Sequence, residues 1–334
     1  YEAAEVNAFG KTRVVTGINP ASFQFHLESG ESFEAPEAIM TYSDNGFNGM
    51  STNLHAFVRN CIVRGQWKHK ARPVLLNSWE AAYFDINERK LLNLAKAGKD
   101  VGIELFVMDD GWFGNRNSDN CALGDWKVNE DKLQGGLKNL VDEVNKLGMK
   151  FGIWFEPEMI SPDSDIYRAH PDWCLHTKGR DKSIARTQYV IDYSRKEVRD
   201  HIYSMMHKIL SENNIAYVKW DFNRSICDKY STWLGKEKQG EFMHRYMLGL
   251  YYVLETLVQR FPHVLFEGCS GGGGRFDAGI LAYSPQIWAS DNSDAVSRLK
   301  IQYSTSVCYP LSTISAQALL VPGSAVLQWR WRRH

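Results

Sequence analysis

Residues 216–224 join a short β-prone run to polar side chains that can do chemistry. The run reads AYVKWDFNR, with Lys219, Asp221 and Asn223 at its end. In barrels of alternating strands and helices, the catalytic side chains come from the carboxyl ends of the strands. A buried strand that delivers a carboxylate at this end is typical of an active site, so Asp221 is the first candidate for the reacting residue.

Several other apolar runs end in an acid, an aromatic residue or a thiol. None of them alternates polar with apolar residues, which is the pattern of strands buried on both faces of a parallel sheet. These predicted strands lie at residues 73–80, 104–112, 151–158, 264–269 and 286–291, with a further strand at 188–192. The last strand is expected at residues 307–312 or in the segment that follows.

Segments with helical periodicity lie between the predicted strands. They cover residues 86–97, 133–147, 195–210 and 240–260. Strands that alternate with such helices predict βαβ units and a parallel sheet. A count of about eight strands and a length near the ~250 residues typical of the fold predict an α/β fold, a (β/α)8 TIM-type barrel over residues 71–334.

Residues 1–70 follow a different pattern. Residues 22–27 alternate polar and apolar side chains and precede a glycine-containing turn at 28–31, which is typical of a half-exposed antiparallel sheet. A piece of this size buries little surface by itself. We therefore expect residues 1–70 to be the C-terminal remnant of an antiparallel β-sandwich domain that precedes the barrel.

The composition excludes several classes of partner. The 39 Lys and Arg residues balance the 39 Asp and Glu residues, so no net field attracts nucleic acid or an anionic membrane. The six cysteines form no CxxC pair, which argues against a structural zinc site and a redox dithiol and favours a cytoplasmic location. No apolar run approaches the length needed to span a bilayer.

No cofactor and no metal site is predicted. A phosphate cradle needs a Walker or dinucleotide fingerprint, and the glycine run at residues 271–274 has neither the lysine nor the downstream acid of such a motif. Its glycines favour instead a loop whose backbone approaches a ligand closely. The histidines, among them His170, His201 and His263, lack the spacing of metal ligands.

Tryptophans lie at or near the predicted strand ends, among aspartates and asparagines. Flat apolar rings beside hydrogen-bond acceptors suit a sugar, whose C–H face stacks on the ring while its hydroxyls donate to carboxylates. Each ring can equally fill a large core, where tryptophan is usually well buried. The residues concerned are Trp79, Trp112, Trp126, Trp154, Trp220 and Trp288.

A series of motifs along most of the chain, from Thr12 to about Tyr309, follows the order known from one enzyme family. The motifs are VVTGINP at residues 14–20, FVMDDGWF at 106–113, LGDW at 123–126, GIWFEPEM at 152–159, KWDFNR at 219–224 and EGCSGGGGRFD at 267–277. They resemble those of the bacterial α-galactosidases (melibiases) of glycoside hydrolase family 36. The resemblance implies a retaining hydrolase that removes terminal α-D-galactosyl residues from galactosides of the melibiose and raffinose type.

The resemblance implies that Asp221 is the nucleophile and that Asp291 is the general acid and base. Lys219 lies two residues before Asp221 on the same face of the strand, so its charge favours the ionised nucleophile. The Asp221 anion favours a protonated Asp291 by repulsion, and this repulsion ends once Asp221 is glycosylated. Retaining enzymes in general hold the two carboxyl groups roughly 5–5.5 Å apart.

Alternatives to both assignments follow from the residue types. Asp221 could be a structural acid paired with Arg224 or Lys219 at the barrel rim. Asp294 lies one helical turn after Asp291 and has the same chemistry. The resemblance favours Asp291, and Asp294 is then expected to cap a helix N-terminus.

The resemblance also implies how galactose is held, because adjacent carboxylates at the end of the second strand can accept from the hydroxyls on carbons four and six. The implied substrate-binding residues are Asp109 and Asp110 at these hydroxyls, Trp79 and Trp154 as pocket walls, Lys219 at ring hydroxyls, Asn223, Cys269 and Gly272 around carbon two, and Arg186 near the nucleophile. Glu156 and Glu158 form a further acidic pair, which could orient Arg186 or Lys219 or do chemistry, and which ranks below the two aspartates.

Three classes of function fit the motifs. The first is hydrolysis of α-galactosides, with α-N-acetylgalactosaminide hydrolysis as a near neighbour. The second is galactosyl transfer of the raffinose-synthase kind, and the third is sugar binding without catalysis. The family carries β domains before and after the barrel and often forms tetramers, so we expect this chain to be a fragment, unstable or weakly active alone, of a homo-oligomeric protein. Residues 317–334 depart from the family pattern and suggest an altered terminus.

Overall fold

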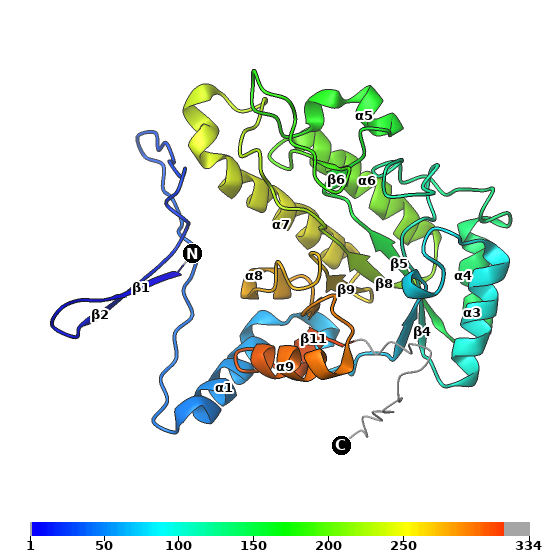
Figure 1. Ribbon diagram of the computed structural model, residues 1–334, viewed down its shortest axis with the longest axis horizontal. Helices are drawn as coiled ribbons and strands as arrows, with labels where there is room; N and C mark the ends of the chain where they lie inside the picture. The colour runs from blue at the N-terminus through cyan, green and yellow to red at the C-terminus, as the bar shows by residue number, and fades with distance from the viewer. Residues whose placement is uncertain (1, 317–334) are drawn as a thin grey trace.

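Seven parallel strands form the central sheet of the molecule. The computed structural model describes residues 2–316, and the strand order is β11-β10-β9-β8-β5-β4-β3. The strands are β3 Leu75–Asn77, β4 Leu105–Met108, β5 Lys150–Phe155, β8 Ile215–Trp220, β9 Leu265–Gly268, β10 Gln286–Trp288 and β11 Ile314–Ser315. The sheet curls, and helices cover its outer side (Figure 1), which is the α/β architecture predicted for a TIM-type barrel.

The four helices predicted from periodicity are confirmed as α3, α4, α6 and α7. Each buries one apolar face against the sheet, as Val198, Ile202 and Met206 do in α6. Asn87 caps α3 by accepting a hydrogen bond from the Lys90 N–H at 3.0 Å. The helices are α1 Gly46–Phe57, α2 Trp79–Ala82, α3 Glu88–Asp100, α4 Gly136–Lys146, α5 Asp165–Ala169, α6 Lys196–Glu212, α7 Phe242–Arg260, α8 Ala278–Leu281 and α9 Ala295–Ser306.

The strand predicted at residues 188–192 does not join the central sheet, so this prediction is wrong. Within it, β7 (Tyr189–Val190) pairs antiparallel with β6 (Met159–Ile160). Both lie in the connection between β5 and β8, where a local antiparallel pairing satisfies the backbone. The last described strand, β11, follows residues 307–312 and pairs with β10 through Ile314 and Ile287. Residues 317–334 lie outside the described part of the chain.

The N-terminal residues form a hairpin followed by a docked segment. The antiparallel pair β1 (Glu2–Val6) and β2 (Thr12–Thr16) projects away from the barrel (Figure 1). Residues 22–27, predicted as a strand, have no regular structure. Their apolar side chains contact α7 instead of a neighbouring strand: the rings of Phe23 and Phe25 lie 6.4 and 5.8 Å from the ring of His244.

The alternation of side chains along the strands decides which residues face the barrel interior. Val107, Tyr217 and Leu265 pack together in one small buried cluster, while Phe106 and Val218 belong to the larger core. Successive side chains of a strand point to opposite faces. By this alternation, the polar residues on the same face of the strands as the small cluster are Asp109, Lys219, Asp221, Glu267 and Cys269.

Candidate active site

The ends of neighbouring strands bring the predicted site residues together. Strand β8 lies between β5 and β9, with Lys219 opposite both Trp154 and Glu267. Asp221 directly follows β8, and Asp109 directly follows β4 on the other side of β5. All of these strands are parallel, so their carboxyl ends lie at one edge of the sheet.

Asp221 is a buried carboxylate whose two oxygens both accept hydrogen bonds. Trp154 Nε1 donates to Oδ2 at 3.1 Å, and the Phe222 N–H donates to Oδ1 at 2.9 Å. The Asp221 N–H donates to the Phe155 carbonyl at 2.8 Å and so fixes the chain after β8 to the end of β5. Burial opposes ionisation, but the charge of Lys219 and the hydrogen bonds outweigh it, and the pKa of Asp221 lies below its ordinary value.

Lys219 is shared between two carboxylates. Its Nζ lies 3.0 Å from Asp109 Oδ2, and its charge also acts on Asp221. Burial alone would lower the pKa of Lys219, but the neighbouring anions raise it overall, with Asp109 the strongest of them. Asn77 Nδ2 donates to the same oxygen of Asp109 at 2.6 Å. The sequence analysis missed Asn77 as a site residue, although its place at the end of β3 is the same signal that marked the aspartates.

Asp110 is held by Arg116, a residue that the sequence analysis missed. Arg116 Nε and Nη2 donate to the Asp110 carboxylate at 3.0 and 2.8 Å, and both side chains are buried. Burial raises the pKa of Asp110, and Arg116 offsets only part of this effect. Arg116 also donates to the carbonyls of Asp119 and Cys121. Arg116 therefore links the loop after β4 to Asp110, the carboxylate that the resemblance predicts to bind galactose.

Asp291 lies at the rim of the barrel after β10, with its side chain reaching solvent. The Cys269 sulfur lies 4.0 Å from Asp291 Oδ1. Gly272 is packed against the same residue, because a Cβ at Gly272 would lie 2.6 Å from the Asp291 nitrogen. Partial burial and the negative charge of Asp221 raise the pKa of Asp291, the direction that a proton donor needs.

Glu156 contacts the backbone that carries Asn223. Its Oε1 accepts from the Asn223 N–H at 2.7 Å, and its Oε2 lies 3.3 Å from Gln188 Nε2. Burial and the charge of Asp221 raise the pKa of Glu156 to about 8. Glu156 therefore carries a proton in most molecules at neutral pH.

Glu158 belongs to a separate network. Trp220 Nε1 donates to Glu158 Oε1 at 2.9 Å, and Arg275 Nη2 donates to the same oxygen at 2.7 Å. The partners suggested for Glu156 and Glu158 by the sequence, Arg186 and Lys219, are thus replaced by other residues.

The remaining predicted residues surround the carboxylates at different depths. Trp79 is half-buried and packs edge-on against the rings of Tyr83 and Phe84. Arg186 is exposed, with a left-handed φ of 48°, and its charge acts on Asp291. The predicted role of Asp294 as a helix cap is confirmed, because this residue is the N-cap of α9 and accepts from the backbone N–H three residues later at 2.7 Å.

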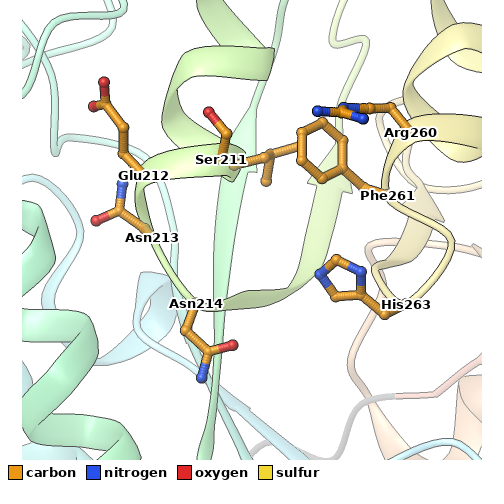
Figure 2. Close-up of a pocket in the computed structure, with 8 residues that line it drawn as sticks. Ser211, Glu212, Asn213, Asn214, Arg260, Phe261 and His263 are labelled. Carbon is orange, nitrogen blue, oxygen red and sulfur yellow. The ribbon is translucent and has the colours of Figure 1, made fainter.

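A pocket of about 470 Å³ lies away from this constellation, at the opposite end of the strands (Figure 2). Its lining comes from the end of α6 and the end of α7, where each helix leads into the next strand. Its only acid is Glu212, and it holds none of the predicted site residues. Within residues 2–316, no cluster of three or more His, Cys, Asp and Glu side chains is arranged to bind a metal, and no helix is long and apolar enough to cross a membrane.

Comparison with known proteins identifies the family. Residues 32–329 match the family model described as melibiase. This chain belongs to the melibiase family. The resemblance to the α-galactosidases of glycoside hydrolase family 36 is confirmed by the relatives described next.

Two melibiase relatives and one solved structure illustrate the similarity. The α-galactosidase AgaA of Geobacillus stearothermophilus is 53% identical over 322 residues, which are 96% of this chain and 44% of that protein. The α-galactosidase Mel36A of Lactobacillus acidophilus is 51% identical over 318 residues, or 95% and 43% of the two chains. A crystal structure of an AgaA variant in complex with raffinose has a TM-score of 0.94, 53% identity, and coverage of 96% of this chain and 44% of that one. This chain thus spans less than half the length of these relatives.

Proposed function

We propose that this chain carries the catalytic centre of a retaining α-galactosidase that works through a covalent galactosyl–Asp221 intermediate. The observation that carries the proposal is that two carboxyl groups at one end of the barrel have pKa values shifted in opposite directions. The pKa of Asp221 is lowered, and the pKa of Asp291 is raised. A retaining glycosidase needs one carboxylate that stays ionised and a second carboxyl group that can donate a proton, and the two shifts have the directions that these roles require. The names of the relatives and the raffinose complex of AgaA support α-galactosides as the substrate class.

The proposed reaction has two displacements. In the first, an oxygen of Asp221 forms a bond to the anomeric carbon of galactose while the glycosidic C–O bond breaks, and the leaving oxygen takes the proton of Asp291. In the second, ionised Asp291 takes a proton from water, the water oxygen attacks the anomeric carbon, and the ester bond to Asp221 breaks. Asp221 leaves as a carboxylate and Asp291 is protonated again, so both groups return to their starting states.

The sugar would lie at the carboxyl ends of the strands, over the side chains that face the barrel interior. Asp109, held by Lys219 and Asn77, is suited to accept from a galactose hydroxyl, because its position is fixed on two sides. Trp154 offers an apolar ring next to the nucleophile that it also hydrogen-bonds. The proposed sugar-binding residues are Trp79, Asp109, Asp110, Trp154, Arg186, Lys219, Asn223, Cys269 and Gly272.

Chemical rescue of Asp221→Gly tests the proposal. The parent chain is assayed on chromogenic α-galactoside, α-glucoside and α-N-acetylgalactosaminide, and only the first should be cleaved well. Asp221→Gly should lose more than about 10³-fold in kcat, and added azide should restore turnover with a galactosyl azide as product. Asp294→Asn, a change at a helix cap, should keep the parent activity.

Other outcomes point to other functions. Preferred cleavage of the α-N-acetylgalactosaminide would replace the proposed substrate. Products that form only with an added sugar acceptor would indicate a transferase, and galactose binding without turnover would indicate a sugar-binding protein. Loss of activity without azide rescue, in a folded variant, would contradict Asp221 as the nucleophile.

A further inference from the structure

Glu158 and Arg275 form a buried ion pair close to Asp221. Arg275 Nη1 donates to Glu158 Oε2 at 3.0 Å, and Nη2 donates to Oε1 at 2.7 Å. The Glu158 side chain is fully buried, and that of Arg275 is 16% exposed. Two parallel hydrogen bonds of this kind fix orientation as well as distance. Tyr246 Oη, on α7, also donates to Oε2 at 2.7 Å, so Glu158 is held by a helix as well as by the loop that carries Arg275.

The pair holds both chain neighbours of Asp221. Trp220 Nε1 donates to Glu158 Oε1 at 2.9 Å. The guanidinium of Arg275 lies 4.6 Å from the centre of the Phe222 ring, within the range of a cation–π contact. The side chains before and after Asp221 both contact one ion pair, which restrains the backbone on either side of Asp221.

Arg275 also ends a loop that touches the segment of Asp291. We call residues 271–275 the glycine loop. A Cβ at Gly272 would lie 2.6 Å from the Asp291 nitrogen, and a Cβ at Gly273 would overlap the Ala289 carbonyl. The backbone of the glycine loop therefore lies directly against the backbone of residues 289–291, with no side chain between them. Ser270, just before the loop, donates to the Phe222 carbonyl at 3.2 Å and provides a second link to the nucleophile segment.

We propose that Glu158 and Arg275 are positioning residues that fix the glycine loop to the Asp221 segment and thereby set where Asp291 lies relative to Asp221. Neither residue touches the substrate in this proposal, which rests on the proposed function. The separation of the two carboxyl groups decides how a glycosidase reacts, and an error of about 1 Å in a catalytic geometry can cost roughly 10²-fold in rate.

The dependence of rate on the leaving group separates positioning from folding. The test variant is Glu158→Gln with Arg275→Met, which removes both charges and leaves no lone buried charge. Its kcat/KM is compared on α-galactosyl fluoride, whose leaving group needs no proton, and on melibiose, whose leaving sugar needs the proton of Asp291. General acid catalysis contributes about 10²–10⁴-fold to the rate. The kcat/KM for melibiose should therefore fall by a factor at least about ten times larger than the kcat/KM for α-galactosyl fluoride. A smaller folded fraction would lower both by the same factor.

The matched control is another pair of glutamate and arginine. Glu241 is the buried N-cap residue of α7, and Arg245 lies in the first turn of this helix. Their hydrogen bonds are to each other and to the backbone of His26, and not to the segments that carry Asp221 and Asp291. Glu241→Gln with Arg245→Met should keep the parent ratio of the two substrates. If the Glu158 and Arg275 variant is folded and also keeps the parent ratio, the proposal is wrong. Arg275→Lys, which keeps the charge but loses the paired hydrogen bonds, should change the ratio in the same direction and serves if the double variant does not fold.

Hydrogen exchange tests the inference independently of turnover. A chain that cleaves no α-galactoside would overturn the proposed function, but the glycine loop can still be examined. The Gly274 N–H donates to the Ser270 carbonyl at 3.1 Å, and the Ser270 N–H donates to the Gly272 carbonyl at 2.9 Å. Both amides should exchange at least about tenfold faster in the Glu158 and Arg275 variant and at the parent rate in the control. Equal exchange in all three proteins would overturn the inference.

Discussion

A protonated glutamate beside the proposed nucleophile is the most unusual single residue of the site. Glu156 lies close enough to Asp221 for the two charges to repel, and both side chains are buried. Lys219 stabilises the charge of Asp221, whereas the groups that donate hydrogen bonds to Glu156, the Asn223 N–H and Gln188 Nε2, are neutral. The ionised form is therefore favoured at Asp221, the residue proposed as the nucleophile.

Replacing Glu156 by Gln should remove a pH dependence of stability. The pKa of Glu156 is raised to about 8 in the folded chain and is near 4.3 in an unfolded one. Between these values the folded chain binds the extra proton, so this group makes stability fall as pH rises, by at most about 1.4 kcal/mol per pH unit. Glu156→Gln keeps the oxygen that accepts from Asn223 and lacks this slope. Urea unfolding at pH 5, 6.5 and 8 measures the difference, and parallel curves for both proteins would contradict the assignment.

The residues at strand ends could be predicted from the sequence, and their partners could not. Asp109 and Asp221 end apolar runs, which is a local signal. Arg116 lies in a loop without a pattern that distinguishes it from a surface arginine, and Arg275 follows the glycine run, which predicts a close backbone approach but no partner for the arginine. Arg275 and Glu158 are 117 residues apart, and their pairing depends on how the barrel closes.

At the scale of elements, buried strands and amphipathic helices are what the sequence predicts well. The helices α3, α4, α6 and α7 match their predicted ranges within a few residues, because each has one continuous apolar face. Residues 22–27 and 188–192 look like strands by the same local rules, yet the first packs its rings on α7 and the second pairs inside a loop. In both cases a tertiary contact overrides the local pattern.

The glycine loop should tolerate a side chain at one glycine and not at its neighbour. Gly271 and Gly272 both have left-handed φ values, of 50° and 84°, but only a Cβ at Gly272 would meet the backbone of Asp291. Gly271→Ala should lose about 1 kcal/mol of stability through backbone strain and keep near-parent activity. Gly272→Ala should also push the Asp291 segment away and lower kcat/KM by roughly 10²-fold. Steady-state kinetics with thermal unfolding of both variants measures this, and equal losses in activity would contradict the packing argument.

At the scale of the whole molecule, residues 23–33 hold the N-terminal segment to the barrel. Phe33 lies 4.6 Å from Phe25 and 5.0 Å from His244, and the Gln24 N–H donates to the Gly240 carbonyl at 3.1 Å. These contacts involve the start of α7, which lies outside the strand ends that carry the carboxylates.

Phe33→Ala should loosen this segment without impairing the site. The loss of aromatic contacts worth about 0.5–1.5 kcal/mol each should make the Gln24 amide exchange about tenfold faster. Galactoside turnover should stay close to that of the parent chain. Phe9→Ala is the control, because Phe9 is 88% exposed and should leave the exchange of Gln24 unaltered. A large fall in turnover for the Phe33 variant would mean that the segment also shapes the active site.

The position of Lys219 has a consequence for selectivity. Its single ammonium group serves Asp109 at the end of β4 and Asp221 at the end of β8, which lie on either side of β5. Under the proposed function, a sugar hydroxyl that donates to Asp109 partly neutralises this carboxylate and leaves Lys219 freer to stabilise the Asp221 anion. Deoxy sugars that lack this hydroxyl should therefore differ from galactose in the rate of the chemical step as well as in binding.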